Sequence, residues 1–195
     1  MVEDFYSYRI TNATFQKINK DKTVSPATQF GCLGKLDAET EIKEVIRKSE
    51  GITVQSRGVP QHIMITLSAH IQIAILRDIF GFHTNGLKKG VWAYGKNGLP
   101  ANFIFTGDVY DLFETDRKLI AHPNCSANTG FKWSLENGSD EVAEIEMEIK
   151  AMADESGEMM YEVFASEIED DSIIAQWHTA FNRELVEAAA SGGEG

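Results

Sequence analysis

The stretch AEIEMEIK, residues 143–150, decides the fold class of this chain. Apolar and charged side chains alternate along it, which is the pattern of a strand with one face on a protein core and the other in water. A polar turn follows at residues 154–158, and residues 159–166 are again rich in apolar and aromatic side chains. The sequence therefore predicts a β-hairpin in which strands 143–150 and 159–166 pair with each other.

A second alternating stretch lies at residues 61–69, where Ile63, Ile65 and Leu67 share one face of a predicted strand. Directly after it, apolar residues recur at helical spacing as far as Ile79, and Gly81 stands where a C-cap glycine is expected. These signals predict one α-helix at about residues 69–80.

Most of the remaining chain favours short strands. They are expected at residues 5–18, 30–36, 91–94, 101–113, 118–121 and 130–135, with Asn-Gly turns at 85–86, 97–98 and 137–138 and a short helix within 173–181. A run of strands interrupted by one helix is not a βαβ repeat, which argues against a doubly wound nucleotide-binding fold. The predicted fold is mainly β, an antiparallel sandwich or small barrel with one inserted helix.

A charged segment at about residues 37–58 is predicted to leave the body of the domain as an extended hairpin arm. Arg47, Lys48 and Arg57 make this arm basic, and Glu41 and Glu44 add carboxylates. Neither a linker nor an internal repeat divides the chain. We therefore expect one domain at residues 1–187, with a C-terminal arm at about 172–187 and a flexible tail at 188–195.

The charge of the chain is negative and uneven. The formal net charge is −12 at pH 7, with +4 on residues 1–97 and −16 on residues 98–195. Because proteins that bind nucleic acid over a broad face present basic surfaces to the phosphates, the charge argues against such binding as the main function. Two interpretations stay open: a solvated acidic face that maintains solubility, or a basic and an acidic end that favour head-to-tail contact between copies.

The sequence offers no catalytic or cofactor motif. Glycine-rich phosphate loops, GxSxG and HExxH are absent. The two cysteines lack a CxxC and the five histidines lack the spacing of a metal site. His122 and Cys125 lie close together, which leaves a thiol hydrolase as an alternative. We expect a protein that is not an enzyme and that uses no cofactor or metal.

No signal peptide and no membrane-spanning segment are expected. Residues 1–10 carry acids and aromatics without an apolar core, and the chain lacks an apolar run of the length that spans a bilayer. The chain is therefore expected to fold in a cytoplasm.

Glu144, Glu146 and Glu148 are expected to project from one face of strand 143–150. Paired carboxylates at strand spacing could cleave glycosides, but acids on an open face stay ionised and lack the separated pKa values of that chemistry. We instead hypothesise that the face lines a passage for DNA, because it would repel phosphates and let nucleic acid slide. Such a passage needs a ring of copies.

Three stretches resemble the major tail proteins, or tail-tube proteins, of long-tailed bacteriophages. They are FYSYRITNATF at residues 5–15, IEDD at 168–171 and QWHTAF at 176–181. The chain length, the single helix after a central strand and the charged hairpin resemble the same family, which shares its fold with the tubes of contractile tails and of the type VI secretion system.

The resemblance implies a hexameric ring whose inner sheets join into one barrel, and rings that stack into a hollow tube for the genome. It implies copies of the chain and other tail proteins as partners, in a virion assembled in the host cytoplasm. The arm, the N-terminal residues and the segment after Asp171 would make contacts between rings, with Arg47, Lys48 and Arg57 against acids of the next ring. The family has no catalytic residues to transfer.

Two further functions stay open. One is another tail or neck component on the same fold, such as a tail terminator. The other is a small ligand-binding β-barrel with Trp92, Trp133 and Trp177 around a pocket, although core or interface positions are the more common place for tryptophan.

Overall fold

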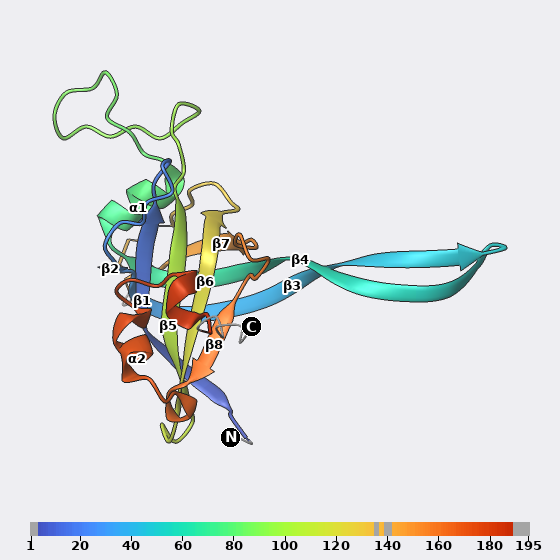
Figure 1. The fold of residues 1–195 in the computed structure, drawn as a ribbon. Coiled ribbons are helices and arrows are strands. Elements are labelled where there is room, and N and C mark those ends of the chain that lie inside the picture. Colours follow the sequence, from blue (N-terminus) through green and yellow to red (C-terminus); the bar gives the residue numbers. More distant parts are fainter. Residues whose placement is uncertain (1–3, 135–136, 139–141, 189–195) are drawn as a thin grey trace, which may run out of the picture.

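The computed structural model describes residues 4–134, 137–138 and 142–188, which fold around one antiparallel sheet of eight strands (Figure 1). The main path of the sheet is β2-β1-β5-β6-β7-β4-β3, and β8 pairs with β6 beside it. The strands are β1 (Ser7–Ile18), β2 (Thr28–Gln29), β3 (Gly31–Ser49), β4 (Ile52–Ile71), β5 (Asn102–Asp111), β6 (Arg117–Ala127), β7 (Ile145–Ala151) and β8 (Tyr161–Phe164). The helices are α1 (Ile73–Phe80), η1 (Ala165–Glu167, a 3-10 turn), α2 (Asp171–Trp177) and α3 (Arg183–Val186). The predicted mainly β, antiparallel fold with an inserted helix is confirmed.

Phe30 joins the two ends of the sheet. It lies between β2, which pairs with β1 at one end, and β3, which forms the other end. The Phe30 N–H donates to the Ala13 carbonyl (2.8 Å), the Phe30 carbonyl accepts from the Gln72 N–H (3.3 Å), and the residue is fully buried. The single sheet therefore curls until its ends meet at this residue, which corresponds to the barrel alternative and not to two packed sheets.

The inner face of the curled sheet and α1 enclose the main hydrophobic core. Ile65 and Leu67 of β4 pair with Ile149 and Met147 of β7, and all four are buried. The two alternating stretches of the sequence thus bury the same face. The core is completed by residues of β1, α1 and β5: Ala13, Phe15, Ile75, Leu76, Ile79, Phe80, Phe103 and Phe105.

Helix α1 begins at Ile73 and not near residue 69 as predicted. Strand β4 continues to Ile71, because Ile71 still pairs with Gly31 of β3. The end of the helix is as predicted: Gly81 adopts a left-handed conformation (φ 70°) and its N–H approaches the Asp78 carbonyl, a geometry that favours glycine.

Strand β8 pairs with β6 and not with β7, so the predicted hairpin between residues 143–150 and 159–166 is wrong. Strand β6 has β5 along one side, whereas its other side pairs with β8 at residues 118–121 and with β7 at residues 125–127. The loop between β7 and β8 runs alongside β6, from the part that pairs with β7 to the part that pairs with β8. Strand β7 itself starts at Ile145, so Glu144 precedes it.

Other predicted boundaries also change. The expected strand at residues 91–94 belongs to a long loop between α1 and β5, and residues 130–134 are irregular, with residue 135 outside the described part. The segments expected separately at 30–36 and in the arm form one continuous strand, β3. The short helix expected within 173–181 is α2, which begins two residues earlier, at Asp171, and ends at Trp177. Of the tail predicted at 188–195, residues 189–195 lie outside the described residues.

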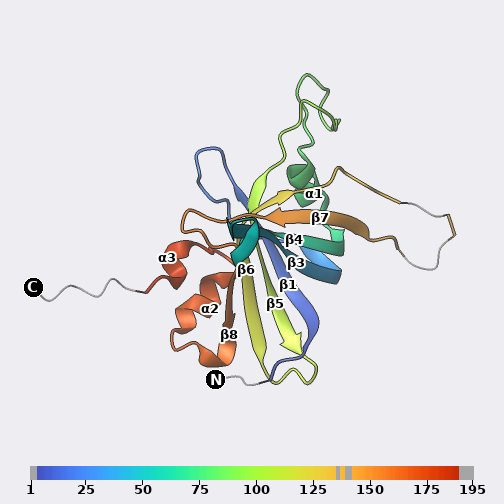
Figure 2. The same ribbon diagram turned by 90° about the vertical axis from the view of Figure 1, so that its right-hand side faces the viewer.

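Helices α2 and α3 cover the opposite face of the β5–β6 pair (Figure 2). Trp177 and Phe181 are buried there against Ile104, Leu119 and Ala121. The Trp177 Nε1–H donates to the Ile120 carbonyl at 3.0 Å. The segment expected as a C-terminal arm thus packs on the sheet of its own chain.

Candidate assembly surfaces

Strands β3 and β4 extend beyond the body of the domain as a two-stranded arm (Figure 1), which confirms the predicted hairpin. Strand β4 pairs with β7 only between Ile63 and Ala69, whereas its pairing with β3 continues to Ser49 and Ile52 beside the turn. Between Ile63 and the turn at the tip of the arm, the described residues add no third strand to β3 and β4. An isolated two-stranded hairpin is marginally stable in water, and its free edges can pair with another chain. The arm therefore has the form of a docking element.

The arm also leaves apolar side chains in water. Ile42 is 60% exposed and Ile52 is 70% exposed. Val45, Ile46 and Val54 are likewise exposed along the same hairpin. Burial of one such side chain contributes about 1.5–3 kcal/mol. Burial of several of them under a partner would therefore supply a large part of the free energy of binding.

The pairing register shows which face of the arm each basic residue occupies. Lys43 and Arg47 lie on one face of β3, and Arg57 lies on the same face because it pairs with Val45. Lys48, the next residue along β3, points to the other face. The structure thus brings Arg47 and Arg57 together, adds Lys43 and separates Lys48 from them.

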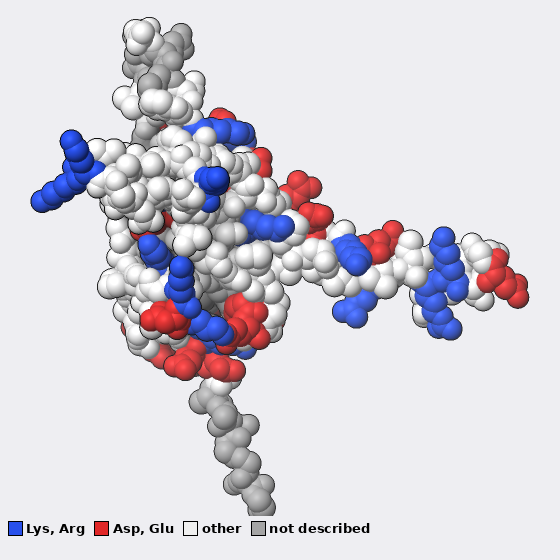
Figure 3. All heavy atoms as spheres, turned by 90° about the horizontal axis from the view of Figure 1, so that it is seen from above, with Lys and Arg blue, Asp and Glu red and all other residues white. Residues whose placement is uncertain are grey.

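Figure 3 shows Lys and Arg side chains along the middle and outer parts of the arm, with Asp and Glu side chains among them and at its tip. Glu44 pairs with Gly58 and lies on the face opposite that of Arg47 and Arg57. Lys43 could have been found from its alternation with Arg47, but the place of Arg57 requires the pairing of β3 with β4.

Acidic side chains gather on the outer face of β3, β4 and β7. Glu146 and Glu148 of β7 pair with Ser68 and Thr66 of β4, and Thr66 also pairs with Asp37 of β3. We call this surface the acidic sheet face; its carboxylates are those of Asp37, Glu39, Glu41, Glu146 and Glu148, with Lys35 and Lys150 among them.

The acidic sheet face differs from the predicted set in two ways. Glu41 belongs to it, with its Oε2 at 2.9 Å from His62 Nε2, and not to the basic part of the arm. Glu144 does not share the strand: its carboxylate lies directly over Gly34, 2.3 Å from where a Cβ would stand. Asp37 and Glu39 were missed because only the sheet order places β3 and β7 on either side of β4.

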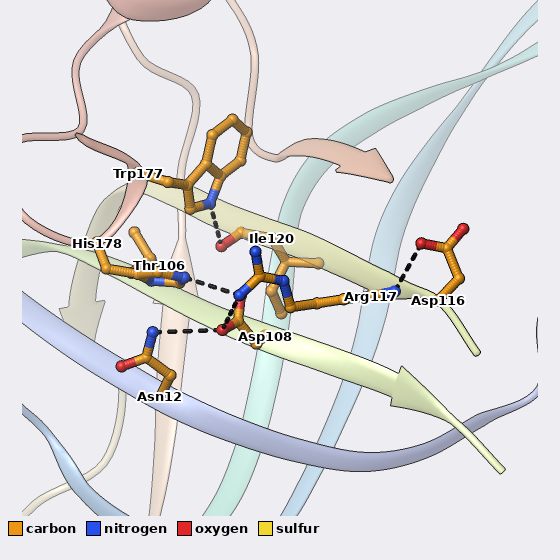
Figure 4. A network of polar contacts seen from close by, with 8 residues as sticks. All are labelled: Asn12, Thr106, Asp108, Asp116, Arg117, Ile120, Trp177 and His178. Carbon is orange, nitrogen blue, oxygen red and sulfur yellow. Dashed lines mark hydrogen bonds and ion pairs between the residues drawn. The ribbon is translucent and has the colours of Figure 1, made fainter. Parts of the chain in front are cut away.

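A buried polar network holds the end of α2 on the sheet (Figure 4). Asp108 of β5 accepts a hydrogen bond from Asn12 Nδ2 (3.3 Å) and lies 2.8 Å from His178 Nε2 and 3.6 Å from an Arg117 nitrogen. His178 Nδ1 lies 2.7 Å from Thr106 Oγ1. An acid, a histidine and a hydroxyl in contact can support nucleophilic catalysis, but Thr106 is fully buried, so its hydroxyl is shielded from any substrate.

The structure contradicts the thiol hydrolase alternative. Cys125 is fully buried, burial raises the pKa of its thiol, and its sulfur donates to the His122 carbonyl at 3.6 Å. Burial also lowers the pKa of His122 to about 4, and His122 Nδ1 lies 3.2 Å from the Met159 carbonyl. A buried neutral thiol is not a nucleophile.

The three tryptophans do not surround a pocket. Trp177 is buried between α2 and the β5–β6 pair, whereas Trp133 is 70% exposed. Trp92 is also exposed and packs against Arg77, whose guanidinium carbon lies 4.3 Å from the ring centre. The ligand-binding barrel that depended on these three residues is therefore wrong.

Two classes of site are absent from the described part of the chain. Residues 4–134, 137–138 and 142–188 contain no cluster of three His, Cys, Asp or Glu side chains placed to hold a metal ion. Within the same ranges, no helix combines the length and the hydropathy needed to cross a membrane.

Comparisons with known proteins give a low structural similarity. The sequence matches none of the protein-family models and none of the curated proteins with which it was compared. A chain in the cryo-EM structure of the anti-feeding prophage cap (AFP tube terminating cap) is 16% identical with a TM-score of 0.41. A chain in the 6-fold symmetrised AFP baseplate is 12% identical with a TM-score of 0.40. Each alignment covers 84% of this chain and 97% of the other. At these scores neither structure assigns a function to this chain.

Proposed function

We propose that this chain is a structural subunit of a phage tail tube, which assembles with copies of itself into stacked, hexameric rings around a passage for DNA. The observation that carries the proposal is the arm, residues 42–61, to which the described part of the chain adds no third strand. Its exposed apolar residues and the shared face of Lys43, Arg47 and Arg57 fit a contact with an acidic, partly apolar surface of another copy.

The sequence stretches at 5–15, 168–171 and 176–181 support the same family of functions through their resemblance to tail-tube proteins. The proposal makes other tail proteins the further partners, and it locates the chain in a virion assembled in the host cytoplasm. It assigns no reaction to the chain.

The acidic sheet face is proposed to line the passage. Five carboxylates on β3 and β7, the two strands that flank β4, make a negative surface on the side of the sheet that is not packed on the core. Such a surface repels phosphates, so DNA passes without being held. In this arrangement Glu146 and Glu148 face the lumen, together with Asp37, Glu39 and Glu41.

The experiment shortens the arm. Replacement of residues 42–61 by Asn-Gly joins Glu41 to His62, which already pair, through a two-residue turn suited to a hairpin. We expect the full chain to form rings and tubes in negative-stain electron microscopy, and the shortened chain to form neither while its body still unfolds cooperatively in urea. Rings and tubes formed equally by the shortened chain would contradict the proposal.

Two point variants provide a matched comparison. Ile52 is 70% exposed on the arm and Val142 is 81% exposed outside it, so Ile52→Ser and Val142→Ser remove similar apolar groups. Only Ile52→Ser is expected to weaken assembly. Single rings that never stack would favour the tail-terminator alternative. A full chain that stays monomeric at high concentration, even with a tail initiator complex, would show the proposal to be wrong.

A further inference from the structure

One end of the molecule carries a basic loop. The stretch 79–107 contains no acidic residue. Lys88, Lys89 and Lys96 are exposed in its loop between α1 and β5, and Lys132 is exposed on the neighbouring segment. Within the described residues, none of these four lysines has a carboxylate partner. Exposed aromatic and apolar residues accompany them: Trp92, Tyr94, Leu99 and Trp133. We call this set the basic loop surface.

The basic loop is held in place although it contains no strand or helix. His83 and Ala93 exchange two backbone hydrogen bonds across it, at 3.0 and 2.9 Å. The Tyr94 ring stacks on Phe82 with centres 5.2 Å apart, and the Tyr94 hydroxyl accepts from the Phe131 N–H at 3.2 Å. Since these contacts order the loop before any partner arrives, binding loses little conformational entropy.

The opposite end of the molecule carries an acidic surface. Glu169, Asp170 and Asp171 are exposed at the start of α2. They lie beside the β5–β6 turn, because Ser166 donates to Asp116 Oδ2 at 2.6 Å. The turn exposes Leu112 (52%) and Phe113 (78%). We call these five residues, Leu112, Phe113, Glu169, Asp170 and Asp171, the acidic turn surface.

The two surfaces lie at opposite ends of β5. The basic loop leads into Asn102, where the strand begins, and the acidic turn follows Asp111, where it ends. Figure 1 shows the long loop above the sheet and the β5–β6 turn below it. Translation of a second copy along the strand axis therefore brings the basic loop surface of one molecule to the acidic turn surface of the next.

We infer that these two surfaces form the head-to-tail contact between successive copies of this chain. Each has exposed apolar residues beside charge of one sign, and the signs are opposite, so the contact combines apolar burial with charge complementarity. Because the two patches differ, the contact is heterologous and can repeat without closing. This inference rests on the proposed function and adds to it a second contact, separate from the arm.

A charge-exchange experiment tests the inference. Lys88→Glu/Lys89→Glu reverses the loop, and Glu169→Lys/Asp171→Lys reverses the acidic turn; Asp170 is left intact because it caps α2 through the Ser172 N–H. Each double variant is expected to weaken self-association about tenfold, measured by sedimentation and electron microscopy, since several surface charge pairs change sign. The quadruple variant restores opposite charges and is expected to recover most of the loss.

Control variants separate this contact from net charge and from the arm. Lys20→Glu/Arg183→Glu changes the net charge as much as the loop variant, at two exposed positions outside the arm, the acidic sheet face and both end surfaces, and it should leave self-association unchanged. A quadruple variant no better than either double variant would overturn the inference. Loss of assembly on arm shortening, with no effect of any end variant, would do the same and leave the proposed function intact. If the full wild-type chain bound short duplex DNA through the basic loop surface and did not self-associate, nucleic acid would be the partner of that surface. That result would overturn the inferred head-to-tail contact.

Discussion

His178 Nε2 lies 2.8 Å from Asp108 Oδ1, across the contact between α2 and the sheet. The Asp108 side chain is 3% exposed and also contacts Asn12 and Arg117. A buried carboxylate is tolerated only where such partners compensate its lost hydration. This contact therefore fixes where the C-terminal helices sit, and with them the acidic turn surface.

Substitution of Asp108 is expected to destabilise the domain. Asp108→Ala leaves His178 and Arg117 without their buried partner, so the free energy of unfolding should fall by about 3 kcal/mol in urea denaturation. Glu169→Ala, at an exposed carboxylate, should change it by no more than about 0.5 kcal/mol. A double-mutant cycle with His178→Ala measures the coupling; equal effects of Asp108→Ala and Glu169→Ala would refute the role of the network.

The tryptophans allow a comparison of buried and exposed positions. Trp177 is 1% exposed and packs with Phe181, whereas Trp133 is 70% exposed. Trp177→Ala should lower the free energy of unfolding by about 3–5 kcal/mol through the cavity it leaves. Trp133→Ala should have little effect on stability and should instead weaken self-association. If both variants unfolded at the same urea concentration, the result would contradict the burial of Trp177 between α2 and the sheet.

The stability of the domain should depend on pH through His122. Burial lowers the pKa of His122 from 6.5 to about 4, because desolvation disfavours the charged ring. Between these values the unfolded chain binds a proton that the folded chain does not, so the free energy of unfolding falls as the pH falls from about 6.5 to 4. Since one pKa unit corresponds to about 1.4 kcal/mol, the loss approaches about 3 kcal/mol.

The matching variant is His122→Asn, whose amide can still donate to the Met159 carbonyl that His122 contacts. Urea denaturation between pH 7 and pH 4 should show a smaller loss for this variant than for the wild type. An equal slope for the two proteins would assign the pH dependence to other groups.

The acidic sheet face should control the retention of DNA. Glu146→Lys/Glu148→Lys places two cations on the proposed lumen surface, so assembled tubes should bind short duplex DNA with an affinity that falls steeply with salt. Glu184→Lys/Glu187→Lys makes the same change in charge at α3 and should not retain DNA in the tube. Retention by the α3 variant alone would place the lumen elsewhere.

The strands with strong alternation could be predicted because their pattern lies within the segment itself and does not depend on its neighbours. Ile63, Ile65 and Leu67 recur at a period of two, and a strand is the conformation that places them on one face. The C-cap at Gly81 was predicted for a similar reason, since a glycine after an apolar helical period favours the left-handed conformation that ends a helix. The length and charge of residues 37–58 likewise indicated the arm.

Pairing between strands could not be predicted in the same way. Strands β7 and β8 follow each other in the chain, yet β8 pairs with β6, because β4 and β6 already occupy the two edges of β7 where it enters the loop. The start of α1 was misplaced for a related reason: the last residues of β4 stay extended only because β3 pairs with them.

The sequence by itself determined the mainly β class, the charged arm and the separation of a basic from an acidic half, because each follows from residue type and local spacing. Only the tertiary structure decided which charges share a surface. It joined Asp37, Glu39 and Glu41 to Glu146 and Glu148 through the order of the sheet, and it brought Asp108 to His178, 70 residues away. The physical reason is that local periodicity fixes which face of an element is apolar, whereas the choice of neighbour depends on packing between segments distant in the chain.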